Sequence, residues 1–268
     1  MTAPFDVTPL LAPNTPAPAA RYNGFPRFNF VGGHNDPKNV PVEALVEAAT
    51  TVLRREGVTL ATYGLESGPL GYRPLREFLA AKLKDHAAIA CSPDEILITS
   101  GSLQGLDLVN SLLLAPGDTV IVEQETYGGA LTRLARLGVK VVGVPLDGEG
   151  LRLDALEMAL ADLKAKGVTP KYIYTIPTVQ NPTGAIMGVE RRKALLALAR
   201  KYGVLVFEDE CYSDLVWDGD RPPSIYSMAD GEGVIFVGSF SKSIAPALRV
   251  GYIVAKWDIL SRILGLKQ

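Results

Sequence analysis

The stretch VIFVGSFSKSIAPALRVGYIVA, residues Val234–Ala255, joins two apolar runs through a turn of small residues that contains Lys242. Neither run alternates apolar with polar residues, so each predicts a strand that is buried on both faces. Only a short loop separates them, and one of the two strands is therefore expected to run antiparallel. A lysine between buried strands needs an explanation, because burying an unpaired charge is costly.

Upstream of this stretch, short apolar runs alternate with segments of helical periodicity. The predicted strands are residues 95–101, 118–124, 140–146, 171–177, 204–210, 233–239 and 249–255. The predicted helices are residues 41–57, the second half of 63–86, and 102–114, 127–138, 153–167, 188–203 and 256–268. Strands joined by helices of this length indicate an α/β fold, with a mostly parallel sheet covered by helices on both faces.

The first 40 residues differ from the rest because they are rich in Pro, Asn and Gly and lack periodicity. We expect residues 1–40 to form an N-terminal arm and part of a small domain, and residues 41–268 to form the large domain. A chain of 268 residues that is 47% hydrophobic is long enough to bury a large core.

Composition excludes several classes of function. The formal net charge is −2 and no basic run occurs, which argues against binding to nucleic acid. No apolar run is long enough to span a membrane. Two distant cysteines, Cys91 and Cys211, favour a reducing, cytoplasmic setting over a disulfide framework. The two histidines, His34 and His86, have no metal-ligand spacing, so we expect no zinc site.

Polar side chains follow the predicted strands at the edge where an open α/β sheet binds its ligands. Ser100-Gly101-Ser102 opens a helix, whose free N–H groups and dipole suit a phosphate, although the same residues are ordinary helix caps. Asn181 lies in a loop after one strand, and Glu208-Asp209-Glu210 ends the next. A metal site among these acids is conceivable but lacks nearby histidines.

Lys242 and Arg249 complete this edge. A lysine held near an arginine and away from water has its charge disfavoured, which makes its amine a better nucleophile toward carbonyls. A lysine for the aldehyde, a carboxylate for the pyridine nitrogen and a helix N-terminus for the phosphate together favour a pyridoxal phosphate site.

The chain resembles the fold-type I pyridoxal-phosphate enzymes of the class I/II aminotransferase group, and within it the 2-aminoadipate/kynurenine-type branch. The resemblance covers nearly the whole chain from about Gly32 onward. It is carried by YGLESGPLGYRPLREFLA, ITSGSLQGLDLV, PTVQNPTG, FEDECYSDL and SFSKSIAPALRVGY, in this order.

The resemblance implies a role for Lys242 as the Schiff-base lysine, which would also move the proton between the substrate's α-carbon and the cofactor. It implies that Asp209 pairs with the pyridine nitrogen. The other implied cofactor contacts are Asn181 and Tyr212 on the phenolic oxygen, Tyr127 stacked on the ring, and Ser102, Leu103, Gln104, Ser239 and Arg249 around the phosphate. The cofactor would be pyridoxal 5'-phosphate, and the substrates an amino acid and a 2-oxo acid.

The resemblance also implies a homodimer, in which Tyr63 reaches the phosphate of the partner subunit. Gly33 and Asn181 would contact the substrate. The sequence ends at KWDILSRILGLKQ, whereas family members continue into a C-terminal small domain that carries the arginine for the substrate's α-carboxylate. We therefore expect that small domain, and that arginine, to be absent from these 268 residues.

Three alternatives to transamination remain open on the sequence. The same scaffold supports lyase chemistry such as C–S β-elimination, because a cofactor motif does not determine the reaction. A shortened chain could also be a cofactor-binding fragment without activity. A cofactor-sensing regulatory domain is disfavoured, because residues 1–30 are too short and too Pro-rich for a DNA-binding winged helix.

Overall fold

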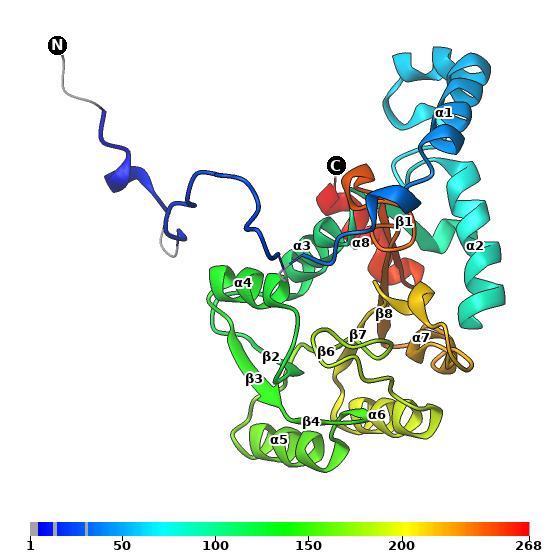
Figure 1. Cartoon of the computed structure of the whole chain (residues 1–268). Helices are drawn as coiled ribbons and strands as arrows, with labels where there is room; N and C mark the ends of the chain where they lie inside the picture. The colour runs from blue at the N-terminus through cyan, green and yellow to red at the C-terminus, as the bar shows by residue number, and fades with distance from the viewer. Residues whose placement is uncertain (1–4, 13–14, 30–31, 268) are drawn as a thin grey trace.

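A seven-stranded sheet forms the centre of the computed structural model, which describes residues 5–12, 15–29 and 32–267 (Figure 1). The strand order is β1-β9-β8-β7-β6-β2-β3. The strands are β1 (Ile96–Thr99), β2 (Thr119–Glu123), β3 (Lys140–Val144), β6 (Tyr172–Thr175), β7 (Leu205–Asp209), β8 (Val234–Ser239) and β9 (Gly251–Val254). Neighbours from β8 to β3 are parallel, whereas β9 is antiparallel to β8 and β1. This confirms the mostly parallel sheet and the antiparallel turn around Lys242.

Helices cover both faces of the sheet. One face packs against α2 (Arg73–Ala87), α5 (Leu153–Ala165), α6 (Val189–Tyr202) and the short α7 (Ile225–Met228). The opposite face packs against α3 (Ser102–Leu113), α4 (Gly128–Leu137) and α8 (Trp257–Lys267). The predicted α/β fold with two helical layers is therefore confirmed.

Strand β8 shows why its sequence is apolar without alternation. Val234 and Phe236 pack into the core under α2, α5, α6 and α7, whereas Ile235 and Val237 pack into the core under α3, α4 and α8. All four side chains are essentially inaccessible to solvent. Burying each one contributes about 1.5–3 kcal/mol of transfer free energy, so this central strand joins two separate cores.

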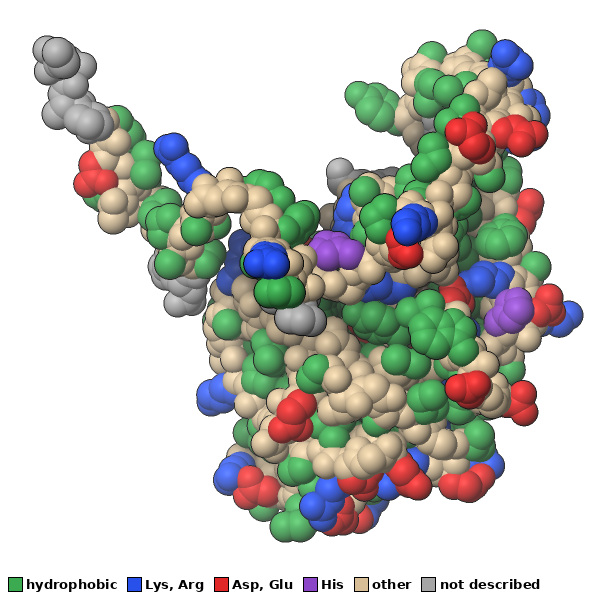
Figure 2. All heavy atoms as spheres, viewed as in Figure 1, with side chains coloured by type: hydrophobic (Ala, Val, Ile, Leu, Met, Phe, Trp, Pro, Cys, Tyr) green, Lys and Arg blue, Asp and Glu red, His purple; other side chains and the backbone are tan. Residues whose placement is uncertain are grey.

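Helix α1 (Val42–Glu56) and the 3-10 turns after it project away from the sheet (Figure 1). None of the residues of α1 is buried. Hydrophobic side chains lie at the surface of this projection (Figure 2), with Val58 86% and Leu60 64% exposed. The described residues 15–29 also extend away from the body of the protein. The domain boundary at residue 41 stays a prediction.

The remaining short elements were not predicted. A hairpin forms from β4 (Leu146–Asp147) and β5 (Gly150–Leu151). The 3-10 turns are Thr8–Leu10, Pro37–Asn39, Gly57–Ala61, Tyr63–Glu66, Pro93–Glu95, Ser213–Leu215 and Pro246–Leu248. Like α7, these elements are too short for periodicity to reveal. Within the described ranges, none of the helices is both long and apolar enough to cross a membrane.

Candidate active site

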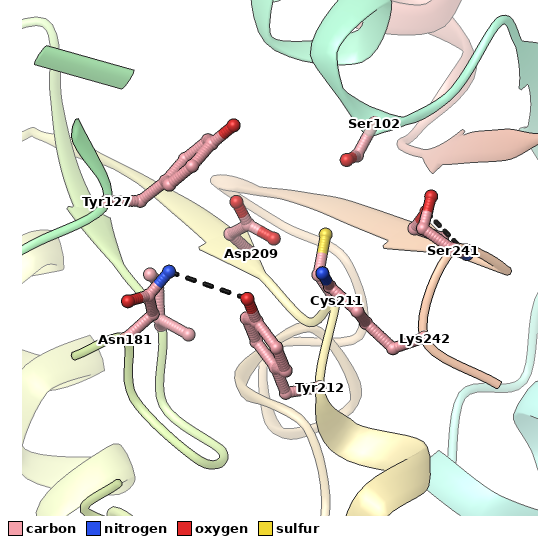
Figure 3. Close-up of a pocket in the computed structure, with 10 residues that line it drawn as sticks. Ser102, Tyr127, Asn181, Asp209, Cys211, Tyr212, Ser241 and Lys242 are labelled. Carbon is pink, nitrogen blue, oxygen red and sulfur yellow. Dashed lines mark hydrogen bonds between the residues drawn. The ribbon is translucent and has the colours of Figure 1, made fainter. Parts of the chain in front are cut away.

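A pocket that is open to solvent lies beyond the carboxyl ends of β6, β7 and β8 (Figure 3). Figure 3 shows Asp209 at the back of the pocket, Tyr127 on one side, and Cys211 and Lys242 on the other. The lining residues are Ser102, Tyr127, Ile176, Asn181, Asp209, Cys211, Tyr212, Ser239, Ser241 and Lys242. They come from segments up to 140 residues apart, since Ser102 and Lys242 both contribute.

Asp209 ends strand β7 and is 3% exposed. The Tyr174 hydroxyl donates a hydrogen bond of 2.6 Å to Oδ2, whereas Oδ1 has no hydrogen-bond partner among the described residues. Burial raises the pKa of Asp209 above its ordinary value. A buried carboxylate oxygen without a partner is costly, so Oδ1 is suited to accept a hydrogen bond from an N–H group of a ligand.

The acids on either side of Asp209 serve the fold instead. Glu208 accepts hydrogen bonds from the backbone N–H groups of Ile225 and Tyr226, at 2.7 and 2.8 Å, and so caps α7. Glu210 accepts one from Thr178 Oγ1 at 2.8 Å and pairs with Arg192 at 3.4 Å. In the part of the chain that the structure describes, His, Cys, Asp and Glu side chains form no group of three that could hold a metal.

Lys242 lies in the turn after β8, and its Nζ donates a hydrogen bond of 2.7 Å to the carbonyl of Gly33. Nζ also lies 5.4 Å from the centroid of the Tyr212 ring. Asn35 Nδ2 donates to the carbonyl of Ile244 at 2.9 Å, which fastens the N-terminal segment to the same turn. A Cβ on Gly33 would lie 2.7 Å from Nζ, so glycine permits this close approach.

The environment of Lys242 differs from the one predicted. The amine was expected to be held away from water beside Arg249, but Lys242 is partly exposed. The physical reason is that the turn lies beyond the sheet, where the pocket opens to solvent. Arg249 is exposed and donates hydrogen bonds of 3.3 Å to the carbonyls of Pro246 and Ser100.

Asn181 and Tyr212 meet at the lower side of the pocket in Figure 3, where Asn181 lies below Tyr127 and Tyr212 lies toward Lys242. Asn181 Nδ2 and Tyr212 Oη are 3.5 Å apart, and the Asn181–Pro182 peptide bond is cis. Burial raises the pKa of Tyr212 and of Tyr127. Both phenols therefore remain protonated near neutral pH and can donate hydrogen bonds.

The N-terminus of α3 closes the upper end of the pocket. Ser102 is the first residue of this helix, and Leu103 and Gln104 follow in its first turn. Nearby, the Ser239 hydroxyl lies 2.9 Å from Ser241 Oγ and accepts a hydrogen bond of 3.1 Å from the Ser241 N–H. Free N–H groups at a helix N-terminus, together with two serines and a guanidinium, are well suited to bind an anion.

Most of the predicted site residues thus come together. The structure places Ser102, Tyr127, Asn181, Asp209, Tyr212, Ser239 and Lys242 on the pocket wall, and Gly33, Leu103, Gln104 and Arg249 beside it. Tyr63 is fully exposed in the projection and does not line the pocket of its own chain. The sequence analysis did not assign Ile176, Cys211 and Ser241 to the site, although they line the pocket. Each of them stands next to an assigned residue or to the end of a strand, and that position was the signal that indicated them.

Residues 33–268 match the family model for aminotransferase class I and II. The chain belongs to this aminotransferase family. It is 37% identical over 90% of its length to aromatic-amino-acid aminotransferase 1 of Thermococcus litoralis, and 38% identical over 90% to 2-aminoadipate transaminase of Thermus thermophilus. The chain covers 57% and 58% of these two relatives.

A solved structure shows the same relationship to the aminotransferases. The α-aminoadipate aminotransferase of Thermus thermophilus, crystallised with N-(5'-phosphopyridoxyl)-L-leucine, superimposes with a TM-score of 0.80 and is 38% identical. The match covers 89% of this chain and 59% of that one. The chain therefore has the fold-type I architecture over somewhat more than half the length of its relatives.

Proposed function

We propose that this chain carries the cofactor site of a pyridoxal-phosphate-dependent aminotransferase, which moves an amino group between an amino acid and a 2-oxo acid. The observation that supports this best is the unpartnered Oδ1 of buried Asp209, which faces the pocket that Lys242 and the N-terminus of α3 enclose. An acceptor, an amine and an anion site around one pocket match the three polar parts of pyridoxal 5'-phosphate.

Each residue would hold a different part of the cofactor. Asp209 would accept the proton of the ring nitrogen, and Asn181 and Tyr212 would donate to the phenolic oxygen. Tyr127 would cover one face of the ring. The phosphate would be bound by Ser102, the N–H groups of Leu103 and Gln104, Ser239 and Arg249. When bound, the cofactor supplies an aldehyde that reacts with amines and a ring that accepts electrons.

Lys242 has two tasks in this proposal. Its Nζ would attach the cofactor covalently and, once displaced by the substrate's amino group, would move a proton at the substrate's α-carbon. The hydrogen bond to the Gly33 carbonyl holds Nζ at the pocket wall, where a proton acceptor is needed. Gly33 and Asn181 would line the place of the substrate.

The relatives bear on the choice between reactions. Those named above are aminotransferases for aromatic amino acids and for 2-aminoadipate, so transamination is preferred to the C–S lyase alternative. We further propose a homodimer in which Tyr63 reaches the partner's site. A cytoplasmic location is proposed because Cys91 and Cys211 are both free thiols.

The test is covalent trapping of the cofactor. After incubation with pyridoxal 5'-phosphate and reduction with borohydride, we expect one added cofactor mass on the peptide that contains Lys242. Lys242→Ala should remove this specific labelling, whereas Lys256→Ala should keep it, because Lys256 is paired with Glu95 away from the pocket. Equal labelling of the wild type and Lys242→Ala would contradict the proposal.

A further inference from the structure

The side chain of Gln180 lies between the loops that follow β2 and β6, and the residue is only 2% exposed. Its Nε2 donates hydrogen bonds to Glu123 Oε2 at 2.9 Å and to the carbonyl of Glu125 at 2.6 Å. Its Oε1 accepts hydrogen bonds from the N–H and the hydroxyl of Thr183, each at 2.8 Å. Both donors and both lone pairs of the amide are therefore used.

This arrangement requires an amide at position 180. Two acceptors face Nε2 and two donors face Oε1, so a glutamate here would bring its carboxylate against the Glu125 carbonyl and, at pH values above the Glu123 pKa of about 7, also against the carboxylate of Glu123. A methionine would fill similar space but would remove the amide's hydrogen bond from all four groups, of which Glu123 Oε2 would keep only the one from the Ile176 N–H. Because unpaired buried polar groups are costly, the chemistry of this one side chain matters to both loops.

Both loops carry walls of the pocket. Glu125 comes two residues before Tyr127, and Gln180 comes directly before Asn181. Glu123 is itself fully buried and accepts hydrogen bonds from Thr175 Oγ1 at 2.6 Å and from the Ile176 N–H at 3.2 Å. Gln180 therefore joins a firmly held strand end to the two segments that present Tyr127 and Asn181.

We propose that Gln180 is a positioning residue, which holds the Tyr127 and Asn181 loops together and so sets the separation of two walls of the pocket. Its effect on the cofactor rests on the proposed function. Its effect on the loops does not, because the hydrogen bonds join described residues of the protein alone.

The first test measures amide hydrogen exchange without added cofactor in residues 124–131 and 178–186. Gln180→Met should accelerate exchange in both segments by about tenfold, because each loses hydrogen bonds to the amide. The matched control is Tyr172→Phe, which removes a buried hydrogen bond to Asn110 at the opposite end of β6 and should leave both segments unchanged. Acceleration of 178–186 alone would overturn the proposal.

A second pair of variants covers the case in which Gln180→Met fails to fold. Gln180→Glu alone keeps the acceptor for Thr183 but opposes Glu123, and it should expose residues 124–131 to faster exchange. Adding Glu123→Gln restores the hydrogen bond between positions 123 and 180, with residue 123 now the donor and residue 180 the acceptor. The double variant should regain protection in residues 178–186, whereas residues 124–131 should stay faster than in the wild type, because the Glu125 carbonyl still faces a carboxylate. Wild-type protection of residues 124–131 in the double variant would overturn the proposal.

The third measurement follows the absorbance of bound pyridoxal 5'-phosphate against pH. If Gln180 acts through Asn181, Gln180→Met and Asn181→Ala should both raise the midpoint of the change, since each weakens a donor to the phenolic oxygen. The double variant should shift no further than Asn181→Ala alone. Additive shifts would overturn the positioning role, whereas a wild type that binds no cofactor would instead count against the proposed function.

Discussion

Three consecutive acids at the end of β7 have different roles, because neighbouring positions on the strand place their side chains in different surroundings. Glu208 caps a helix, Glu210 pairs with an arginine and a threonine, and Asp209 alone faces the pocket. Successive side chains of a strand point to opposite faces, so the middle acid is separated from its neighbours. The sequence predicted the importance of Asp209, but the partners of the other two acids come from distant segments.

Replacing Asp209 with Asn tests whether Oδ1 accepts a hydrogen bond from the cofactor. The amide keeps an acceptor for Tyr174 but loses the negative charge, so the affinity for pyridoxal 5'-phosphate should fall by tenfold or more, in line with about 1.5–3 kcal/mol for a charged hydrogen bond. The affinity is measured by titration of protein fluorescence. Asp214→Asn, which alters an ion pair with Lys82, is the control and should bind normally. Unchanged affinity in Asp209→Asn would remove Asp209 from the site.

The raised pKa of Glu123 predicts that the free energy of unfolding depends on pH. Burial raises its pKa from 4.5 to about 7, so the folded state keeps a proton that the unfolded state loses as the pH rises above 4.5. The free energy of unfolding should therefore fall between pH 5 and pH 8, with up to about 3 kcal/mol from this group. Glu208, whose pKa burial also raises to about 7, acts in the same direction.

Urea unfolding at pH 5 and pH 8 measures this effect. Glu123→Gln has no proton to lose, so its stability should change less over this range than that of the wild type. Glu157→Gln, a change in a surface pair with Lys201, should follow the wild type. The same pH dependence in all three proteins would show that Glu123 does not titrate as described.

At the scale of elements, the approach of β9 to the first turn of α3 shapes the anion site. A Cβ on Gly251 would lie 2.6 Å from the carbonyl carbon of Gly101 and from the backbone nitrogen of Ser102. The helix N-terminus can therefore reach the pocket only because β9 begins with glycine. The sequence predicted both elements at these positions but contained no sign of their close contact.

Gly251→Ala should push the N-terminus of α3 outward. The affinity for pyridoxal 5'-phosphate should fall by about tenfold, while the weaker affinity for pyridoxal, which lacks the phosphate, changes little. Binding of the two compounds is compared by equilibrium dialysis. Gly265→Ala is the control, since its Cβ would meet open space in α8, and it should stabilise the protein by up to about 1 kcal/mol. Equal losses for both ligands would point to general damage of the pocket instead.

At the scale of the whole molecule, the projection formed by α1 and the turns after it exposes many apolar side chains and buries none of the residues of α1. Tyr63 is fully exposed there, and Val58 and Leu60 are largely exposed. Apolar side chains gathered on an unsupported helix add little to the stability of a single chain. The proposed homodimer gives this projection a role, because it would carry Tyr63 into the site of the second subunit.

Subunit mixing tests the shared site. Tyr63→Ala should leave the unfolding of the isolated chain unchanged, because Tyr63 buries no surface, but should weaken cofactor binding in the dimer severalfold. Mixed with Lys242→Ala, it should form dimers in which one site combines the intact Lys242 and Tyr63, and binding at that site should return to the wild-type affinity. Sedimentation measures the dimer, and the absence of recovery would place Tyr63 outside the partner's site.

The amino-acid sequence by itself determined the order and type of the long elements, the antiparallel turn around Lys242, and the edge of the sheet at which the site lies. It could do so because these features depend on local periodicity and on the rule that parallel strands end together. Only the tertiary structure decided which oxygen of Asp209 is free, how exposed Lys242 is, and that Gln180 ties two loops together. Each of these depends on contacts between residues tens to hundreds of positions apart, such as Gly33 with Lys242, and no local pattern encodes them.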